Sequence, residues 1–203
     1  MTKSLCVMRH RADRDRGFFQ AYYEAQHAPL ALRHFPFTRY VRNHLIDGDD
    51  LPFDTVSEFW AHDIAATIGL MQGPIGDILR ADEAMFMDQS SIAAAGAEEH
   101  VLSAGDPGGE RVVTLLGEAD GVDAAFRTAA LAWARAVAER MPAVSLDFVV
   151  PWGTPAFPAA ALLWSPQPPG APPAALADRA RSLRARRCET PAKELLGNGA
   201  GGA

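Results

Sequence analysis

The chain has 203 residues, of which 48% are hydrophobic, so it can form one large domain or two small ones with a buried core. Its formal net charge of −6 argues against nucleic acid or an anionic membrane as the main partner. No stretch reaches the ~18 uninterrupted apolar residues of a membrane helix, and the first residues contain no apolar signal segment, so we expect a cytoplasmic protein.

The first half of the chain has the element order β-α-β-β-α-β. Asp15 can cap a helix over residues 16–33. A second helical pattern over residues 63–86 is broken at Gly73-Pro74. Strands are expected over residues 4–10, 37–46, 55–62 and 98–104. This order is the split βαβ arrangement of ferredoxin-like domains.

The second half repeats this order more faintly after a Gly- and Pro-rich linker, residues 104–110. The expected elements are strands over 111–119, 144–152 and 160–165 and helices over 120–140 and 172–187. No final strand is expected, and the arginine-rich run 179–187 is interpreted as a solvated helix face.

We therefore predict an α+β fold made of two tandem ferredoxin-like units. Unit boundaries are expected at residues 1–105 and 106–190, with a disordered tail over 191–203. Each open sheet has one bare face, and packing the two bare faces together buries both in a barrel. One such unit beside an unrelated α+β domain is the alternative.

The most informative segment is the first predicted helix. Tyr23 and His27 are four residues apart, so both project from one helix face. Pro29 disfavours helical geometry before it and lacks an N–H donor, which places His27 at a bend or a helix end. A histidine in such a position can act as a general acid or base. Alternatively, it only satisfies backbone groups at a helix terminus.

Polar side chains also share one face of the strand over residues 37–46. Alternation groups Tyr40, Arg42 and His44, and we expect this face to point away from the helices into the space between the sheets. There these groups need partners or a ligand.

The next strand offers Glu58 and Trp60 on one face by the same reasoning. Together with the Tyr, Arg and His side chains, they would form a site for proton transfer on an aromatic or enolisable substrate. A solvated strand face or an Arg42–Glu58 ion pair is the alternative. Asp82 can orient a histidine or remain a solvated carboxylate.

Motifs for metals and cofactors are not found in the sequence. The histidines form no HxH or HExxH pattern, and no CxxC occurs, so no metal and no cofactor are predicted, although a metal held by distant residues stays open. The sequence contains neither a phosphate-binding glycine loop nor a G-x-S-x-G nucleophile elbow.

Four blocks of residues ~4–104, found in order, resemble the EthD family, part of the dimeric α+β-barrel group. The matching positions are Tyr22, Tyr23, His27, Pro29 and Leu30; Tyr40, Val41, Asn43 and His44; Asp54, Val56, Glu58 and Trp60; and Asp82, Glu83, Phe86 and Asp88. The resemblance implies a ferredoxin-like unit whose sheet pairs with another around an internal cavity. The second half carries no matching motif and is compatible with a degenerate second copy, which would make the chain an intramolecular dimeric α+β barrel.

Relatives in this group include dehydratases, decarboxylases, cyclases, cofactor-free monooxygenases and proteins that accompany oxidative degradation systems. We accordingly expect a metal-free lyase or isomerase that acts on an aromatic or polyketide-like small molecule in the barrel cavity. His27 would be the acid or base, with Tyr23, Tyr40 and Arg42 stabilising developing charge. The alternatives are a non-catalytic binding or accessory protein and a haem-binding or cofactor-free monooxygenase. A homodimer is compatible with each of them.

Overall fold

The computed structural model describes residues 2–118 and 122–199. The end of the strand expected over 111–119, the start of the helix expected over 120–140, and residues 200–203 of the expected tail lie outside these ranges. The described chain forms two compact units. Unit 1 contains residues 2–44, 49–93 and 188–199, and unit 2 contains residues 45–48 and 94–187. The C-terminal segment therefore belongs to the same unit as the N-terminal strand.

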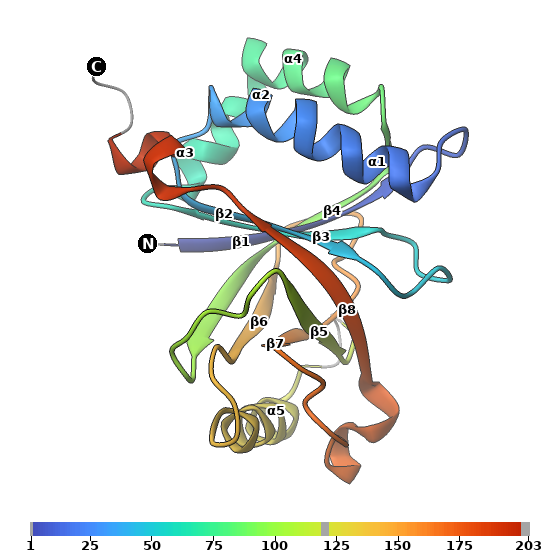
Figure 1. The fold of residues 1–203 in the computed structure, drawn as a ribbon, viewed down its shortest axis with the longest axis vertical. Helices are drawn as coiled ribbons and strands as arrows, with labels where there is room; N and C mark the ends of the chain where they lie inside the picture. The colour runs from blue at the N-terminus through green and yellow to red at the C-terminus, as the bar shows by residue number, and fades with distance from the viewer. Residues whose placement is uncertain (1, 119–121, 200–203) are drawn as a thin grey trace. The chain divides into compact units, whose positions relative to one another are not determined.

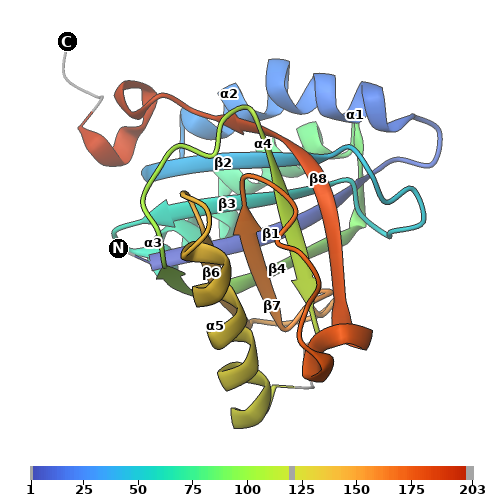
Figure 2. The ribbon, with the colours of Figure 1, turned by 60° about the horizontal axis from the view of Figure 1, so that its bottom comes forward.

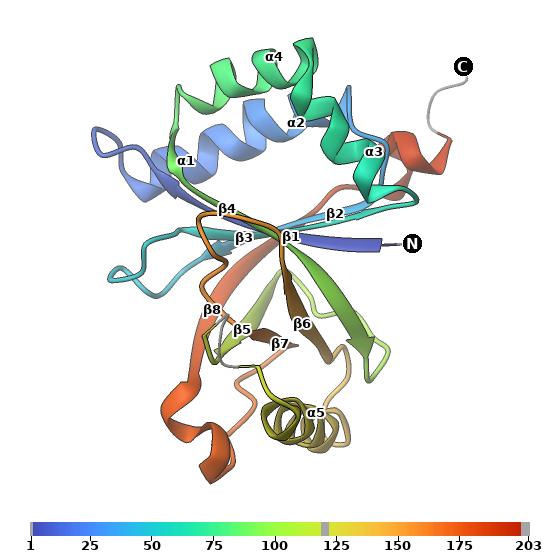
Figure 3. The same cartoon turned by 180° about the vertical axis from the view of Figure 1, so that it is seen from behind.

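The sheet of unit 1 has an antiparallel order of β1 (Thr2–His10), β3 (Thr55–Ala61) and β2 (Phe37–Leu45). Helices cover one face of this sheet, and Figures 1 and 3 show α1, α2 and α4 side by side above it. They are α1 (Arg16–Tyr22), a π-helical turn (Tyr23–His27), α2 (Ala28–Leu32), α3 (Ile64–Gly69), a 3-10 turn (Leu70–Gln72) and α4 (Pro74–Glu83).

Local sequence signals explain where these helices begin. The side chain of Asp15 accepts a hydrogen bond from the Phe18 N–H, and Asp63 caps α3 in the same way. Gly73 precedes α4, and Pro74 occupies its first turn, where a missing N–H costs nothing. Both helical segments of the first half are therefore confirmed. Their apolar faces bury a cluster with the sheet that includes Phe19, Tyr23, Tyr40, Leu79 and Phe86.

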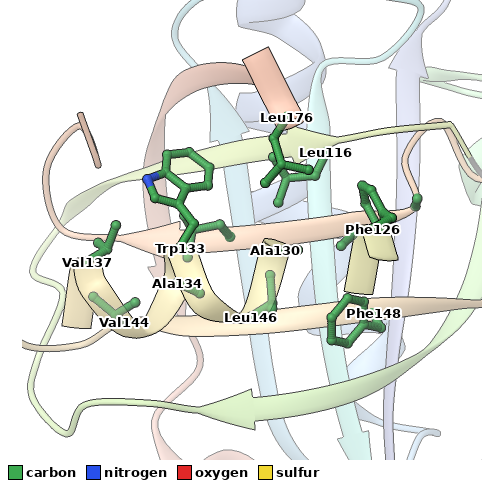
Figure 4. Packing of buried hydrophobic residues seen from close by; sticks show 13 residues of the cluster. Leu116, Phe126, Ala130, Trp133, Ala134, Val137, Val144, Leu146, Phe148 and Leu176 are labelled. Carbon is green, nitrogen blue, oxygen red and sulfur yellow. The ribbon is translucent and has the colours of Figure 1, made fainter. Parts of the chain in front are cut away.

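Unit 2 has an antiparallel sheet whose strand order is β8-β5-β7-β6-β4. The strands are β4 (Met87–Val101, which begins in unit 1), β5 (Glu110–Leu116), β6 (Ser145–Pro151), β7 (Ala161–Ser165) and β8 (Ala180–Glu189). Helix α5 (Ala124–Ala138) packs against β6, as Figure 2 shows. Its apolar face, with Phe126, Ala130 and Trp133, meets Leu146 and Phe148 of the sheet (Figure 4).

The helix predicted over residues 172–187 is wrong. A 3-10 stretch, Ala174–Arg179, is followed by strand β8. In β8 the buried Leu183 and Ala185 alternate with the exposed Arg184 and Arg186, which is the two-residue period of a strand and not that of a helix. The second half therefore ends in a strand, β8, which the sequence did not predict.

Two other expectations differ from the structure in extent. The strand expected over 98–104 begins already at Met87 and ends at Val101. Within the expected tail, the described residues form 3-10 turns at Ala192–Glu194 and Leu196–Asn198, and Leu195 is buried in the core of unit 1. Local composition predicts disorder here, but the burial of Leu195 and a 2.9 Å hydrogen bond from the Asn198 amide to the Thr38 carbonyl tie the segment to unit 1.

The mixed α+β class is confirmed. The second half contains β5, α5, β6 and β7 in the expected order, followed by a 3-10 stretch in place of the second helix and by the unexpected strand β8. The joining of both units into one barrel stays a prediction. No helix within residues 2–118 and 122–199 combines the length and apolar character needed to cross a membrane.

Candidate active site

The polar face of β2 points toward the helices of unit 1. The strand register aligns Arg42 with Ser57 of β3, and the Ser57 hydroxyl lies 2.9 Å from the Tyr23 hydroxyl on the helical layer. Tyr40 and His44 share this face and also contact helical residues. The expectation that this face points away from the helices is therefore wrong. The polar groups lie between the sheet and its helices.

Glu58 and Trp60 lie on the opposite face of the sheet from Arg42. The Glu58 carboxylate is 2.8 Å from the Lys3 ammonium and accepts a hydrogen bond from the Asn43 amide at 3.0 Å. The Lys3 ammonium also lies 4.6 Å above the Trp60 ring. The expectation that Glu58 meets the Tyr, Arg and His side chains is therefore wrong. The alternative, an Arg42–Glu58 ion pair, is wrong as well, because adjacent strand positions point to opposite faces.

A π-helical turn, Tyr23–His27, positions the side chains of Tyr23, Glu24 and His27 over the sheet. The N–H of Ala28 bonds to the carbonyl of Tyr23, five residues back, and the helix then continues as α2 with Pro29 in its first turn. The wider turn accommodates a proline that cannot donate to the preceding turn. His27 consequently stands at the end of the turn within a longer helical segment, and not at a bend that ends the helix.

His27 is paired with Asp82, which lies in the last turn of α4. Its Nδ1 lies 2.7 Å from Asp82 Oδ2, and the Tyr22 hydroxyl donates to Asp82 Oδ1 at 2.9 Å. Burial alone would raise the pKa of Asp82, but the hydrogen bonds from His27 and Tyr22 lower it below its ordinary value. The ionised carboxylate can only accept, so Nδ1 carries the proton, and Nε2 is the nitrogen that can take or give a proton in a reaction.

An aromatic wall surrounds His27. The Phe86 ring is fully buried, with its centroid 5.2 Å from that of His27, and it stacks on Tyr22 at 4.8 Å. The Tyr23 ring meets His27 edge-on at 5.1 Å. These packed rings exclude water from the imidazole.

Tyr23 and Tyr40 form a buried hydroxyl chain. The Tyr40 hydroxyl donates to that of Tyr23 at 3.0 Å, and Tyr23 in turn contacts the Ser57 hydroxyl. Burial raises the pKa of both phenols, and for Tyr40 it outweighs the opposing charge of Arg42. Both tyrosines therefore stay protonated at neutral pH and act as hydrogen-bond donors, not as bases.

Glu24 links two of the predicted site residues. Its carboxylate binds the Arg42 guanidinium through two hydrogen bonds, 2.7 and 3.1 Å long, and accepts from His44 Nε2 at 2.6 Å. Burial opposes ionisation, but the hydrogen bonds from His44 and Arg42 prevail and lower the pKa of Glu24 to about 2. Arg42 also donates to the Thr190 hydroxyl and lies 4.5 Å above the Tyr40 ring.

The structure thus brings together six of the predicted site residues and separates two. Glu58 and Trp60 are on the other face, while the residues on the helix side are Tyr23, His27, Tyr40, Arg42, His44 and Asp82. Sequence reasoning missed Glu24, Ser57 and Thr190. Glu24 carried a signal, since it stands three residues before His27, a spacing that places both on one helix face. Thr190 reaches Arg42 only through the fold. Glu24 and His44 also lie close to Cys188. Among the described residues, these three form a group that could hold a metal ion.

Comparison with known proteins agrees with this description of the first half. Residues 11–90 match the EthD domain family, so the resemblance found in the sequence is confirmed for this part of the chain. No curated protein matches the sequence significantly.

Solved structures resemble the fold over nearly the whole chain. A candidate chlorite dismutase has 10% identity and a TM-score of 0.50, with coverage of 97% of this chain and 99% of its own. A candidate monooxygenase from Lactobacillus acidophilus NCFM has 9% identity, a TM-score of 0.50 and coverage of 94% and 96%. An anthrone oxidase-like protein has 9% identity, a TM-score of 0.49 and coverage of 93% and 92%. At such low identity, similarity to the first two structures indicates a shared fold and nothing more.

Proposed function

We propose that the protein is a lyase or isomerase that moves a proton on an aromatic or polyketide-like small molecule by general acid/base chemistry. The substrate would bind on the helix side of the unit 1 sheet, beside His27. The observation that carries this proposal is the 2.7 Å contact between His27 Nδ1 and Asp82 Oδ2. The contact would fix the ring and leave Nε2 as the nitrogen that exchanges a proton with the substrate.

In the proposed step, His27 Nε2 removes a proton from a carbon next to a substrate carbonyl. The electron pair of the broken C–H bond forms the enolate, and the imidazolium that results is stabilised by the Asp82 carboxylate 2.7 Å away. Returning the proton to another carbon completes an isomerisation, and delivering it to a leaving hydroxyl completes a dehydration. Neither outcome requires an oxidant.

The two buried phenols would stabilise the enolate oxygen. Both Tyr23 and Tyr40 remain protonated because burial raises their pKa. A substrate oxygen would take the place of the Ser57 hydroxyl as the partner of the Tyr23 hydroxyl, with Tyr40 donating behind it. Arg42 supports this pair by placing its positive charge 4.5 Å from the Tyr40 ring.

Hydrogen–deuterium exchange at carbon tests the proposal without knowledge of the natural substrate. A panel of enolisable aromatic β-diketones is incubated with the protein in D₂O, and loss of the C–H signal is followed by NMR. We expect at least one compound to exchange faster with the protein than in buffer. The catalysed rate should fall at least 100-fold in His27→Ala. His62→Ala is the matched control, because His62 is exposed and outside the cluster.

Two results would contradict the catalytic proposal. If compounds of the panel bind but exchange no faster than in buffer, or if His27→Ala exchanges as fast as the unmodified protein, the catalytic proposal is wrong. Binding without exchange would favour the non-catalytic, ligand-binding function.

A further inference from the structure

We propose that Glu24, His44 and Cys188 form a binding site for a thiophilic divalent cation such as Zn²⁺, separate from the His27–Asp82 pair. The three residues come from the π-helical turn, from β2 and from the end of β8. One donor atom of each lies within 4.8 Å of the donor atoms of the other two. All three belong to unit 1.

The donor set identifies the class of ion. A carboxylate oxygen, an imidazole nitrogen and a cysteine sulfur are the ligand types that bind zinc, whereas Ca²⁺ and Mg²⁺ prefer oxygen alone. Three protein ligands leave the fourth tetrahedral position open for water or a small ligand. His44 is fully buried, while Glu24 and Cys188 are partly exposed, which gives the ion a route from solvent.

The required movement is small. Ligand atoms around a tetrahedral zinc ion lie roughly 3.3–3.6 Å apart, given its usual bond lengths. The separation of 2.6 Å between His44 Nε2 and Glu24 Oε1 would have to open by about 1 Å. The ion would thus replace this hydrogen bond, and the Cys188 sulfur would close on it from a starting separation within 4.8 Å of the other two donor atoms.

Arg42 need not be displaced. It holds Glu24 Oε2 through Nη2 at 2.7 Å and Oε1 through Nε at 3.1 Å, so Oε1 would give up the bond from Nε to the ion while Oε2 keeps its own hydrogen bond. Hydrogen-bonded carboxylates are the usual arrangement around a metal ligand. The low pKa of Glu24, about 2, means that this ligand is already ionised at neutral pH. The Cys188 thiol must lose its proton to solvent when the ion binds.

Cobalt spectroscopy tests the site directly. The untagged, reduced, full-length protein is titrated with Co²⁺, whose bond to a thiolate gives an intense near-ultraviolet charge-transfer band. We expect the band to saturate at one ion per chain. Cys188→Ala should abolish it and weaken Zn²⁺ binding in calorimetry at least 10-fold, while Cys6→Ala should keep both. Cys6 is the matched control, because its pKa is raised by burial to about 12, which keeps it a thiol.

A measurement on the unmodified protein guards against a variant that fails to fold. Alkylation of Cys188 by iodoacetamide is followed by mass spectrometry with and without Zn²⁺, and we expect the ion to slow it at least 10-fold. Equal alkylation rates, absence of the cobalt band, or a band that survives in folded Cys188→Ala would overturn the proposed site. None of these readouts depends on carbon–hydrogen exchange, so the two proposals can fail separately.

Discussion

Arg42 Nη2 lies 2.7 Å from Glu24 Oε2, and this ion pair ties the helical layer of unit 1 to its sheet. The Arg42 side chain is only 7% exposed, whereas that of Glu24 is 25% exposed. Burial opposes the charge of Arg42, but its hydrogen bonds to Glu24 raise its pKa, so the pair is ionised at neutral pH. Glu24 therefore stabilises two polar residues on the helix side of the sheet, Arg42 and His44.

Glu24→Gln should reduce the free energy of unfolding at pH 7 by about 1–3 kcal/mol after allowance for solvent screening. The pKa of Glu24 is lowered from 4.5 to about 2 in the folded state. Its stabilising contribution is therefore fully present above pH 4.5 and is lost as the pH falls toward 2. Urea unfolding at several pH values should show the difference between the two proteins vanishing in this window. Asp77→Asn removes an exposed ion pair and serves as the control.

Tyr23→Phe should reduce the free energy of unfolding by about 1–3 kcal/mol, because it leaves the hydroxyls of Ser57 and Tyr40 buried without this partner. The combined Tyr23→Phe/Tyr40→Phe variant should lose less than the sum of the single changes. Urea unfolding of the four proteins measures this coupling. Additive losses within experimental error would show that the hydroxyl chain does not act as a unit.

Glu58→Gln should destabilise the protein by about 3 kcal/mol without disturbing the candidate active site. Both side chains of the Lys3–Glu58 pair are buried, so Glu58→Gln removes a counter-charge 2.8 Å from an ammonium in the interior. Because Glu58 lies on the sheet face opposite Arg42, the NMR shifts of the His27 ring should remain unchanged. Glu189→Gln breaks the exposed Arg39–Glu189 pair and should cost less than 1 kcal/mol. Shifted His27 signals in Glu58→Gln would contradict the placement of the two faces.

Leu195→Ala should cost about 2–4 kcal/mol, because Leu195 is 1% exposed and packs in the core of unit 1. Its neighbour Leu196 is 37% exposed, and Leu196→Ala should change stability by less than about 0.5 kcal/mol. Denaturant unfolding compares the two. Equal, small losses would mean that the C-terminal segment does not contribute to the core.

Much of unit 1 could be predicted from sequence because its signals are local. Asp15, the Gly73-Pro74 break and the spacing of Tyr23 and His27 each depend on a few neighbouring residues. Strand alternation likewise placed Tyr40, Arg42 and His44 on one face. It could not say which face meets the helices, because both faces of β2 are buried and the polar one covers a buried network.

The errors arose where tertiary packing decided the outcome. The arginine-rich run of β8 has high helix propensity, yet Leu183 and Ala185 fit a half-buried strand. Thr190 contacts Arg42 across 148 residues of chain, and no local pattern encodes such a contact. The resemblance to EthD proteins identified the blocks that contain His27 and Asp82 but not the hydrogen bond between them.

The proposed mechanism requires Asp82 to hold the proton on His27 Nδ1 so that Nε2 serves as the base. Nitrogen-15 NMR of the imidazole rings measures this directly, in the unmodified protein and in Asp82→Asn. We predict that neutral His27 is the Nδ1–H tautomer and that Asp82→Asn shifts it toward the Nε2–H form that predominates in free histidine. A neutral His27 with its proton on Nε2 in the unmodified protein would contradict the proposed mechanism.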